Sequence, residues 1–135
     1  MNEKKSIEKI REYFSLDRFA TENGITLDER NEKYSLCSVD LDQRHKNAFG
    51  GVMGGAIFTL ADFAFATLTN DENNITVAEN VSINFLSSVK GKKLFAKATY
   101  RKNGRNTCVV NVDVYDDLNR DIALFTGTGF KLKRD

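Results

Sequence analysis

The segment FGGVMGGAIFTLADFAFATL, residues 49–68, is the feature that most constrains the fold of this chain. Residues 55–68 are enough for a helix, and their only polar members are Thr59, Asp62 and Thr67. Apolar side chains would therefore fall on every face of that helix, and a helix that is apolar all round must be covered on all sides. In a chain of 135 residues the natural cover is a curved sheet.

The second half of the chain contains four segments in which apolar and polar residues alternate with the period of a strand. They run over residues 77–85, 94–101, 110–115 and 122–130, with short turns at 90–91, 103–104 and 117–119. Glu79 interrupts the apolar face of the first segment, and Ile122, Leu124 and Phe130 lie on one parity of the last. The pattern predicts an antiparallel meander, whose strands of about ten residues would reach ~33 Å and could bend around a helix of ~21 Å.

The first half adds shorter elements. Ile7, Ile10 and Phe14 recur at helical spacing, which predicts a short amphipathic helix over residues 5–14. The other expected elements are a helical turn or two over residues 16–24 ending at Asn23-Gly24, strands over 25–29 and 33–41, and a loop over 42–51. We therefore expect an α+β fold, a long central helix wrapped by a curved antiparallel sheet, as a single domain of residues 1–135 with residues 1–23 as an N-terminal helical extension.

Charge and composition exclude several classes of protein. The net charge of +1 argues against a nucleic-acid-binding or membrane-surface protein, which would gather basic residues on one face. No apolar run approaches the ~20 residues of a membrane span, and the N-terminus lacks the apolar core of a signal peptide. We expect a soluble, cytoplasmic protein in which Cys37 and Cys108 are reduced, buried small hydrophobes. Two cysteines with one histidine do not indicate a metal site, and no dinucleotide motif indicates a redox cofactor, so we expect no cofactor.

A lone carboxylate in the most apolar segment is costly unless it is paired, hydrogen-bonded or placed at an opening. Burial would raise the pKa of Asp62 toward the range useful for a general base; alternatively, Asp62 caps a nearby loop or pairs with a lysine at the helix surface. Gly54 and Gly55 stand where the loop meets the helix, and bare N–H groups at a helix N-terminus attract developing negative charge. With Asn47 as a further side-chain donor, such groups could serve acyl transfer.

Residues 45–62 resemble the signature of a known family. The stretch HKNAFGGVMGGAIFTLAD, residues 45–62, is similar to the H-x-N-x-x-G-x-x-H-G-G signature, followed by a helical Asp, of hotdog-fold acyl-CoA thioesterases of the phenylacetate-degradation (PaaI-like) group. The spacing from His45 to Asp62 is kept without a gap. The later VSINF strand at 81–85, the LFAKA run at 94–98 and Gly104-Arg105 extend the resemblance over residues 24–132.

The resemblance implies a hotdog fold, a homodimer often paired into a tetramer, and active sites at the dimer interface. It implies that the backbone N–H of Gly54, helped by Asn47, binds the carbonyl of an acyl-CoA or aryl-CoA thioester. It also implies that Asp62 of the partner subunit activates water or attacks directly. The substrate-binding positions would be His45, Met53, Gly55, Arg101 and Arg105. Among these, His45 is expected chiefly to organise the loop.

Two departures from the family pattern define an alternative. The second His of the signature is Met53, which neither donates strongly nor takes a proton, and a Ser or Thr that often assists the Asp falls on Ala78. These changes favour a non-catalytic hotdog module that binds acyl-CoA or serves as a dimerisation domain. Intact Asn47, Gly54 and Asp62 favour a thioesterase.

Two further groups of residues have both a structural and a functional interpretation. Basic residues surround the turns at 90–91 and 103–104, among them Lys90, Lys92, Lys93, Arg101, Lys102 and Arg105. They are either solvated turns or a cradle for the phosphates of CoA. Phe58, Phe63 and Phe65 are expected to pack in the core or an interface, and one of them could line an acyl or aryl pocket.

Overall fold

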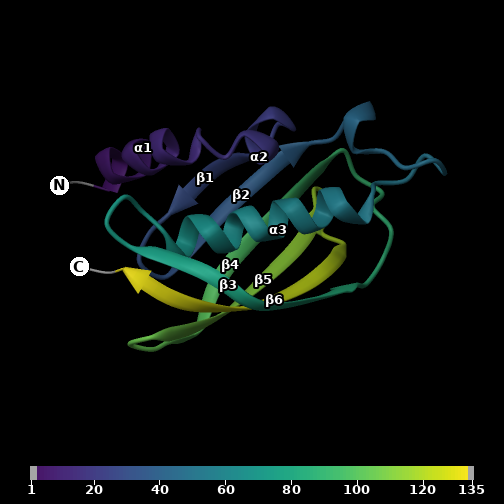
Figure 1. Ribbon diagram of the computed structural model, residues 1–135. Coiled ribbons are helices and arrows are strands. Elements are labelled where there is room, and N and C mark those ends of the chain that lie inside the picture. Colours follow the sequence, from purple (N-terminus) through teal and green to yellow (C-terminus); the bar gives the residue numbers. More distant parts are fainter. Residues whose placement is uncertain (1–2, 134–135) are drawn as a thin grey trace.

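The computed structural model describes residues 3–133 and confirms the expected α+β architecture. The helices are α1 (Glu3–Phe14), α2 (Arg18–Glu22) and α3 (Gly54–Thr69), with a 3-10 turn at Gln43–His45. The strands are β1 (Thr26–Arg30), β2 (Tyr34–Asp40), β3 (Ile75–Phe85), β4 (Lys93–Asn103), β5 (Thr107–Asp116) and β6 (Asp121–Lys133). Figure 1 shows α3 lying across one face of the curved sheet, with α1 and α2 along the side where β1 lies.

The six strands form one antiparallel sheet in the order β1-β2-β4-β5-β6-β3. The prediction of a simple meander is therefore right for β4, β5 and β6 and wrong for β3, which pairs with β6 at the far edge. Alternation identifies a strand but does not name its partner, and strands consecutive in sequence are neighbours only about two thirds of the time. Because β2 and β3 are separated in this way, the chain before α3 and the chain after it lie on opposite sides of the helix.

Two β-bulges change which side chains face α3. Glu79, which interrupts the apolar pattern of β3, stands at a bulge between the pairs that Ala78 and Asn80 form with β6. In β6 the pairing shifts at Ile122, so Ile122 is buried whereas Leu124 and Phe130 are exposed. Their common parity in the sequence therefore does not give them a common face, because one extra residue in a strand reverses the orientation of those that follow.

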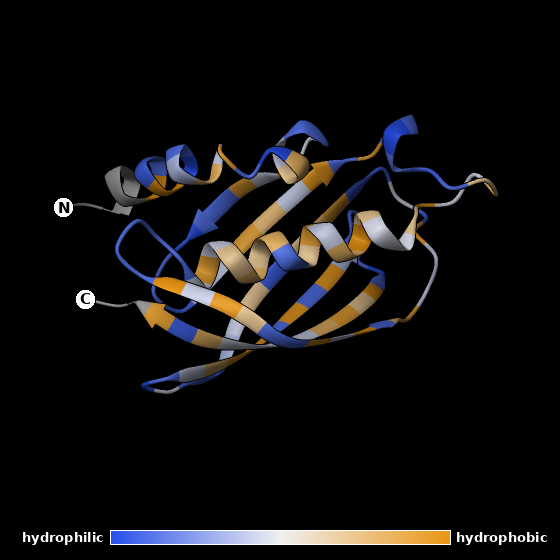
Figure 2. Cartoon of the chain, in the orientation of Figure 1, coloured by the Kyte–Doolittle hydropathy of each residue, from blue (hydrophilic) through white to orange (hydrophobic). Residues whose placement is uncertain are grey.

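The core lies between α3 and the sheet. Figure 2 shows that α3 is coloured mainly as apolar along its length, and nine of its residues are buried. Two of its phenylalanines, Phe63 and Phe65, belong to this core as expected, and the ring of Phe65 lies against β6 at Gly127 and Gly129. Cys37 and Cys108 are fully buried free thiols, and burial raises the pKa of Cys37 to about 12, so they behave as small hydrophobes.

A buried carboxylate anchors the segment that crosses from β3 to β4. Asp116 accepts hydrogen bonds from the N–H groups of Lys90 and Gly91 at 3.1 and 3.0 Å, and from those of Leu118 and Arg120 at 3.0 Å each. Burial alone would raise the pKa of Asp116, but these backbone donors stabilise its charged form and the pKa lies below the ordinary value. Asp116 thereby ties the crossing segment to the β5–β6 turn.

Within the described part of the chain, no helix combines the length and the apolar character needed to cross a membrane.

Candidate active site

The start of α3 presents open backbone donors. Met53 is the N-cap in an extended conformation, and its side chain caps nothing. Its N–H donates to the His45 carbonyl at 2.8 Å, which pins the preceding loop to the helix. Within residues 3–133 the N–H groups of Gly54 and Gly55 donate to no acceptor. Such unsatisfied donors at a helix N-terminus attract an oxygen that carries negative charge.

Asn47 is oriented by the turn that follows it. Its Oδ1 accepts hydrogen bonds from the N–H groups of Phe49 at 2.9 Å and Gly51 at 3.1 Å, and Gly50 supplies the positive φ of 81° that the turn requires. With Oδ1 engaged in the turn, the Nδ2 group is left as the donor, and it has no acceptor within the described residues. The loop thus holds an amide donor in a defined orientation.

Asn47 and Gly54 line the same groove, whose volume is about 390 Å³. Its other wall is the end of β3 and the segment after it, including Phe85, Ser87 and Ser88. A Cβ atom on Gly54 would lie 3.3 Å from the Phe85 ring, so the absence of a side chain at this position leaves room for that close approach. Phe85, Ser87 and Ser88 were not singled out from the sequence as site residues, although Phe85 ends the VSINF run.

Asp62 is half-buried and lines a separate hollow of about 140 Å³ together with Asp17, Phe19 and Thr59. Within residues 3–133 it accepts no hydrogen bond and forms no ion pair, so it neither caps a loop nor pairs with a lysine there. Burial raises the pKa of Asp62 above its ordinary value, and the negative charge of Asp17 adds to this. The sequence contains no signal that would have placed Asp17 beside it.

A single chain brings Asn47 and Gly54 together but leaves Asp62 apart from them. Positions 54 and 62 are eight residues apart on α3, and the two residues line different cavities. That spacing corresponds to about 12 Å along a helix axis. One chain therefore presents the open N–H groups of the Asn47–Gly54 groove and the Asp62 carboxylate at two distinct places.

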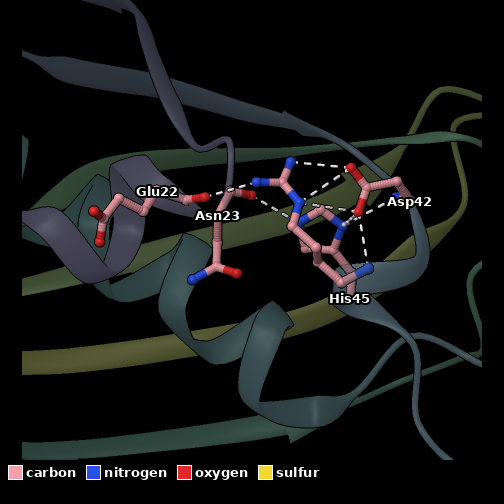
Figure 3. A network of polar contacts seen from close by, with 5 residues as sticks. Glu22, Asn23, Asp42 and His45 are labelled. Carbon is pink, nitrogen blue, oxygen red and sulfur yellow. Dashed lines mark hydrogen bonds and ion pairs between the residues drawn. The ribbon is translucent and has the colours of Figure 1, made fainter.

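The side chain of His45 forms hydrogen bonds to two backbone groups. The Asp42 N–H donates to its Nδ1 at 3.0 Å, so Nε2 carries the proton and donates to the Asn23 carbonyl at 2.7 Å. The ring is buried, and both nitrogens are occupied (Figure 3). Arg44 completes the link, because its guanidinium binds the Asp42 carboxylate and donates to the Glu22 carbonyl. This network ties the 3-10 turn to the end of α2.

The other expected site residues lie in two places. Met53 and Gly55 line a third cavity, between α2 and α3. Arg101 and Arg105 are exposed in and beside the β4–β5 hairpin. This hairpin adjoins the end of α3, where the Tyr100 hydroxyl donates to the Leu68 carbonyl, and Figure 1 shows it at the opposite end of the sheet from the helix start.

A Ser or Thr that assists the Asp would be expected on β3, but β3 places no hydroxyl group beside Asp62 of the same chain. Ala78 is exposed near the bulge of β3, and Ser82 is exposed as well. Thr76 is buried, and its hydroxyl donates to the Thr69 carbonyl at 3.0 Å. Within the residues described, no three His, Cys, Asp or Glu side chains gather into a group that could hold a metal ion.

Comparison with known proteins identifies the family to which this chain belongs. The model of the thioesterase superfamily matches residues 49–123. A putative esterase of Archaeoglobus fulgidus is 31% identical over 96% of this chain and 85% of its own length. The acyl-coenzyme A thioesterase PaaI of Escherichia coli is 28% identical over 86% of this chain and 84% of its own.

Solved structures of similar proteins support the same family assignment. The structure of the E. coli PaaI protein from the phenylacetic acid degradation operon matches with a TM-score of 0.89 at 25% identity, covering 98% of this chain and 96% of that one. A Streptococcus mutans protein bound to acetyl CoA matches with a TM-score of 0.76 at 27% identity, covering 83% and 92% of the two chains. The chain belongs to the thioesterase superfamily, as a thioester hydrolase with the hotdog fold of the PaaI-like group.

Proposed function

We propose that this chain hydrolyses acyl-CoA or aryl-CoA thioesters to the free acid and CoA. The observation that carries the proposal is the open Gly54 N–H at the start of α3, in the same groove as the Asn47 amide. Two donors in one groove can together stabilise the oxyanion that forms when a thioester carbonyl is attacked. Met53 does not weaken this site in principle, because the donor that matters at the helix start belongs to the backbone.

We propose Asp62 of the partner subunit as the general base or nucleophile. As a base, its carboxylate takes a proton from water while the water oxygen bonds to the carbonyl carbon. The C–S bond then breaks, and the proton passes to the leaving thiolate, which yields the acid and free CoA. The raised pKa of Asp62 suits a group that must accept a proton in the transition state. As a nucleophile, the carboxylate would attack the carbonyl carbon and break the C–S bond, so that CoA leaves as a thiolate and takes up a proton. The mixed anhydride that results would then be hydrolysed by water to the free acid and the regenerated Asp62 carboxylate.

A homodimer would bring the two halves of the site together. The β3 edge of the sheet exposes Ile75 and Val77, and an unpaired strand edge with apolar side chains is suited to pairing with a second copy. We propose that dimers assemble in this way and pair further into a dimer of dimers, each chain acting as one domain with residues 1–23 as an extension. In the assembled protein, Arg101 and Arg105 would be the residues that hold the CoA phosphates.

The proposal is tested by substituting Asp62→Asn and measuring release of free CoA from a panel of acyl-CoA and aryl-CoA esters. We expect kcat to fall at least ~100-fold, because the variant lacks the general base. Asp113→Asn, the same change at an exposed position on β5, is the matched control and should retain wild-type turnover.

Thermal unfolding separates loss of chemistry from loss of fold. The pKa of folded Asp62 is raised, so at neutral pH its charge disfavours the folded state, and this penalty decreases as the pH falls through the folded pKa. Asp62→Asn should therefore melt at or above the wild-type temperature. Near wild-type turnover in this variant would remove Asp62 from the mechanism. No turnover in the wild-type protein, with CoA esters still bound, would favour the non-catalytic module.

A further inference from the structure

A third cavity adjoins the start of α3 and shares no lining residue with the groove of Asn47 and Gly54. It has a volume of about 340 Å³ and lies between α2 and the first turns of α3. Its apolar lining consists of Phe19, Ile25, Val39, Met53, Ala56 and Phe58. Gly55, whose N–H is open, also lines it. A thioester carbonyl at the helix start would therefore have this cavity on one side and the groove on the other.

Arg44 is the one Asp, Glu, Lys or Arg among the described residues that line the cavity, and its charge is already compensated. Arg44 donates from Nε to the two carboxylate oxygens of Asp42 at 3.1 and 3.2 Å, and from Nη2 at 3.0 Å. Its Nη1 donates to the Glu22 carbonyl at 2.6 Å (Figure 3). A guanidinium held by a carboxylate in this way is a weak site for a second, incoming carboxylate.

The remaining polar side chains of the lining are bonded as well. His45 uses both ring nitrogens on backbone groups, and the Asn23 amide donates to the Phe19 carbonyl at 2.7 Å. The Thr59 hydroxyl donates to the Gly55 carbonyl at 2.7 Å. These bonds fix the walls before any ligand arrives, which reduces the entropy lost on binding. The cavity is thus preformed, apolar and without an uncompensated charge.

We propose that this cavity holds the acyl group of the thioester, and that it selects apolar acyl groups that have no charged end. The inference rests on the proposed function and specifies its substrate class. An apolar cavity of ~150 Å³ can bind benzene, so roughly twice that volume accommodates an octanoyl or phenylacetyl group. A group that is apolar along its whole length gains by burial here, whereas a terminal carboxylate would be desolvated without a partner.

Phe19 and Ala56 are the residues that set this preference. Phe19 stands on α2 at the rim and is 73% exposed in the single chain, so little of its apolar surface is buried there. An acyl chain in the cavity would cover that ring. Ala56, in the first turn of α3, has a small side chain, and a larger one at this position would occupy the volume that the acyl group needs.

The first test compares esters with the wild-type protein. Butyryl-CoA and succinyl-CoA have acyl chains of the same length, and they differ in the terminal carboxylate. We expect kcat/KM for the butyryl ester to exceed that for the succinyl ester at least ~10-fold, because the terminal carboxylate would lose its hydration without gaining a partner. Octanoyl-CoA should exceed acetyl-CoA at least ~10-fold, which is a lower bound, because a single well-packed methylene in an apolar pocket can contribute about that much. Equal use of butyryl and succinyl esters would overturn the proposal.

The second test changes the cavity. Ala56→Leu and Phe19→Ala should each lower the ratio of octanoyl to acetyl kcat/KM at least ~5-fold, by filling the cavity and by removing one wall. Leu16→Ala truncates another strongly exposed apolar side chain of the N-terminal segment, one that does not line the cavity, and should leave the ratio at the wild-type value. A ratio that neither cavity variant changes would show that the acyl group binds elsewhere.

A binding measurement separates failure of this inference from failure of the proposed function. Calorimetry with S-octyl-CoA and S-ethyl-CoA, thioethers that are not thioesters, reports the same preference without turnover. A preference for the octyl compound that Ala56→Leu abolishes would support the cavity even in a protein that hydrolyses nothing. If turnover depends on Asp62 but the protein shows no preference for the octyl compound, the proposed thioesterase function would be supported and the proposed acyl site would be refuted.

Discussion

At the scale of single residues, two carboxylates share one small hollow without a cation to balance them. Asp17 and Asp62 both line it, and no other titratable residue does among the described residues. The pKa of Asp62 is raised first by burial and then by the charge of Asp17, and burial also raises the pKa of Asp17. Asp17 does not cap α2 with its side chain, so its carboxylate is not otherwise engaged.

We predict that Asp17→Asn moves the acid limb of the kcat/KM profile to lower pH. Removing a neighbouring negative charge makes Asp62 easier to ionise, so its pKa falls, and a base that works as the carboxylate stays active in more acidic solution. The measurement is thiol release across a pH series at low salt. Raising the ionic strength should reduce the difference between variant and wild type.

Glu22→Gln is the control for this experiment. It removes a carboxylate from α2, but Glu22 is paired with Arg18 and does not line the hollow. An acid limb that shifts in Glu22→Gln as much as in Asp17→Asn would assign the effect to net charge. No shift in Asp17→Asn would show that the two carboxylates do not interact in the working enzyme.

Sequence reasoning reached some of these residues and not others, for identifiable reasons. Asp62, Asn47 and Gly54 stand in a contiguous stretch with recognisable spacing, so they could be named in advance. Asp17 and Phe19 belong to a short polar segment whose relation to α3 depends on tertiary packing alone. The one feature of the sequence that pointed to packing against another element was the aromatic residue Phe19 in the otherwise small and polar RFATE helix.

At the scale of elements, the approach of α3 to the sheet depends on two glycines in β6. A Cβ atom on Gly127 would lie 3.1 Å from the Phe65 ring. On Gly129 it would lie 2.5 Å from Cγ2 of Thr76 and 3.1 Å from both the Phe65 ring and the Cys108 sulfur. These contacts are closer than side chains normally tolerate, so the glycines create the space that the helix fills.

We predict that Gly129→Ala lowers the free energy of unfolding by about 1–3 kcal/mol, because the added methyl group must displace Thr76 or the Phe65 ring from a packed interface. Denaturant unfolding followed by circular dichroism measures the change. Gly55→Ala is the control for stability, since no atom lies within 4 Å of a Cβ placed there. Equal stability of Gly129→Ala and wild type would show that the helix can shift on the sheet at little cost.

The elements themselves were largely predictable, and their arrangement was less so. Periodicity located every strand and the long helix to within a few residues, because apolar alternation is a local consequence of one buried face. The placement of β3 beside β6, and the bulge at Ile122, depend on pairing between segments far apart in the chain. No local pattern reports such pairing.

At the scale of the whole molecule, the active site that we propose belongs to two chains. Asn47 and Gly54 of one chain would work with Asp62 of the partner subunit, since the three do not meet within a chain. A twofold dimer would then contain two equivalent sites, each with one carbonyl-binding half and one carboxylate half. If each site is shared in this way, two inactive variants can complement each other in a mixed dimer, which they could not do if each chain held a complete site.

We predict that two inactive variants, Asn47→Ala and Asp62→Asn, restore activity when their subunits are mixed. Random exchange makes half of the dimers mixed, and each mixed dimer has one site with both halves intact, so activity should return to about a quarter of the wild-type value. The subunits are mixed by co-expression with two affinity tags, and tandem purification enriches the mixed dimer, in which half of the wild-type activity is expected.

The control is a mixture in which both variants carry the change in the same half of the site. Asp62→Asn subunits bearing the two different tags should remain inactive after the same purification, because no carboxylate is present to complete either site. A mixed dimer of Asn47→Ala and Asp62→Asn that stays inactive, while sedimentation shows it to be a dimer, would mean that Asp62 serves its own chain. The separation of Asp62 from Gly54 along α3 would then have to be bridged by the substrate within one subunit.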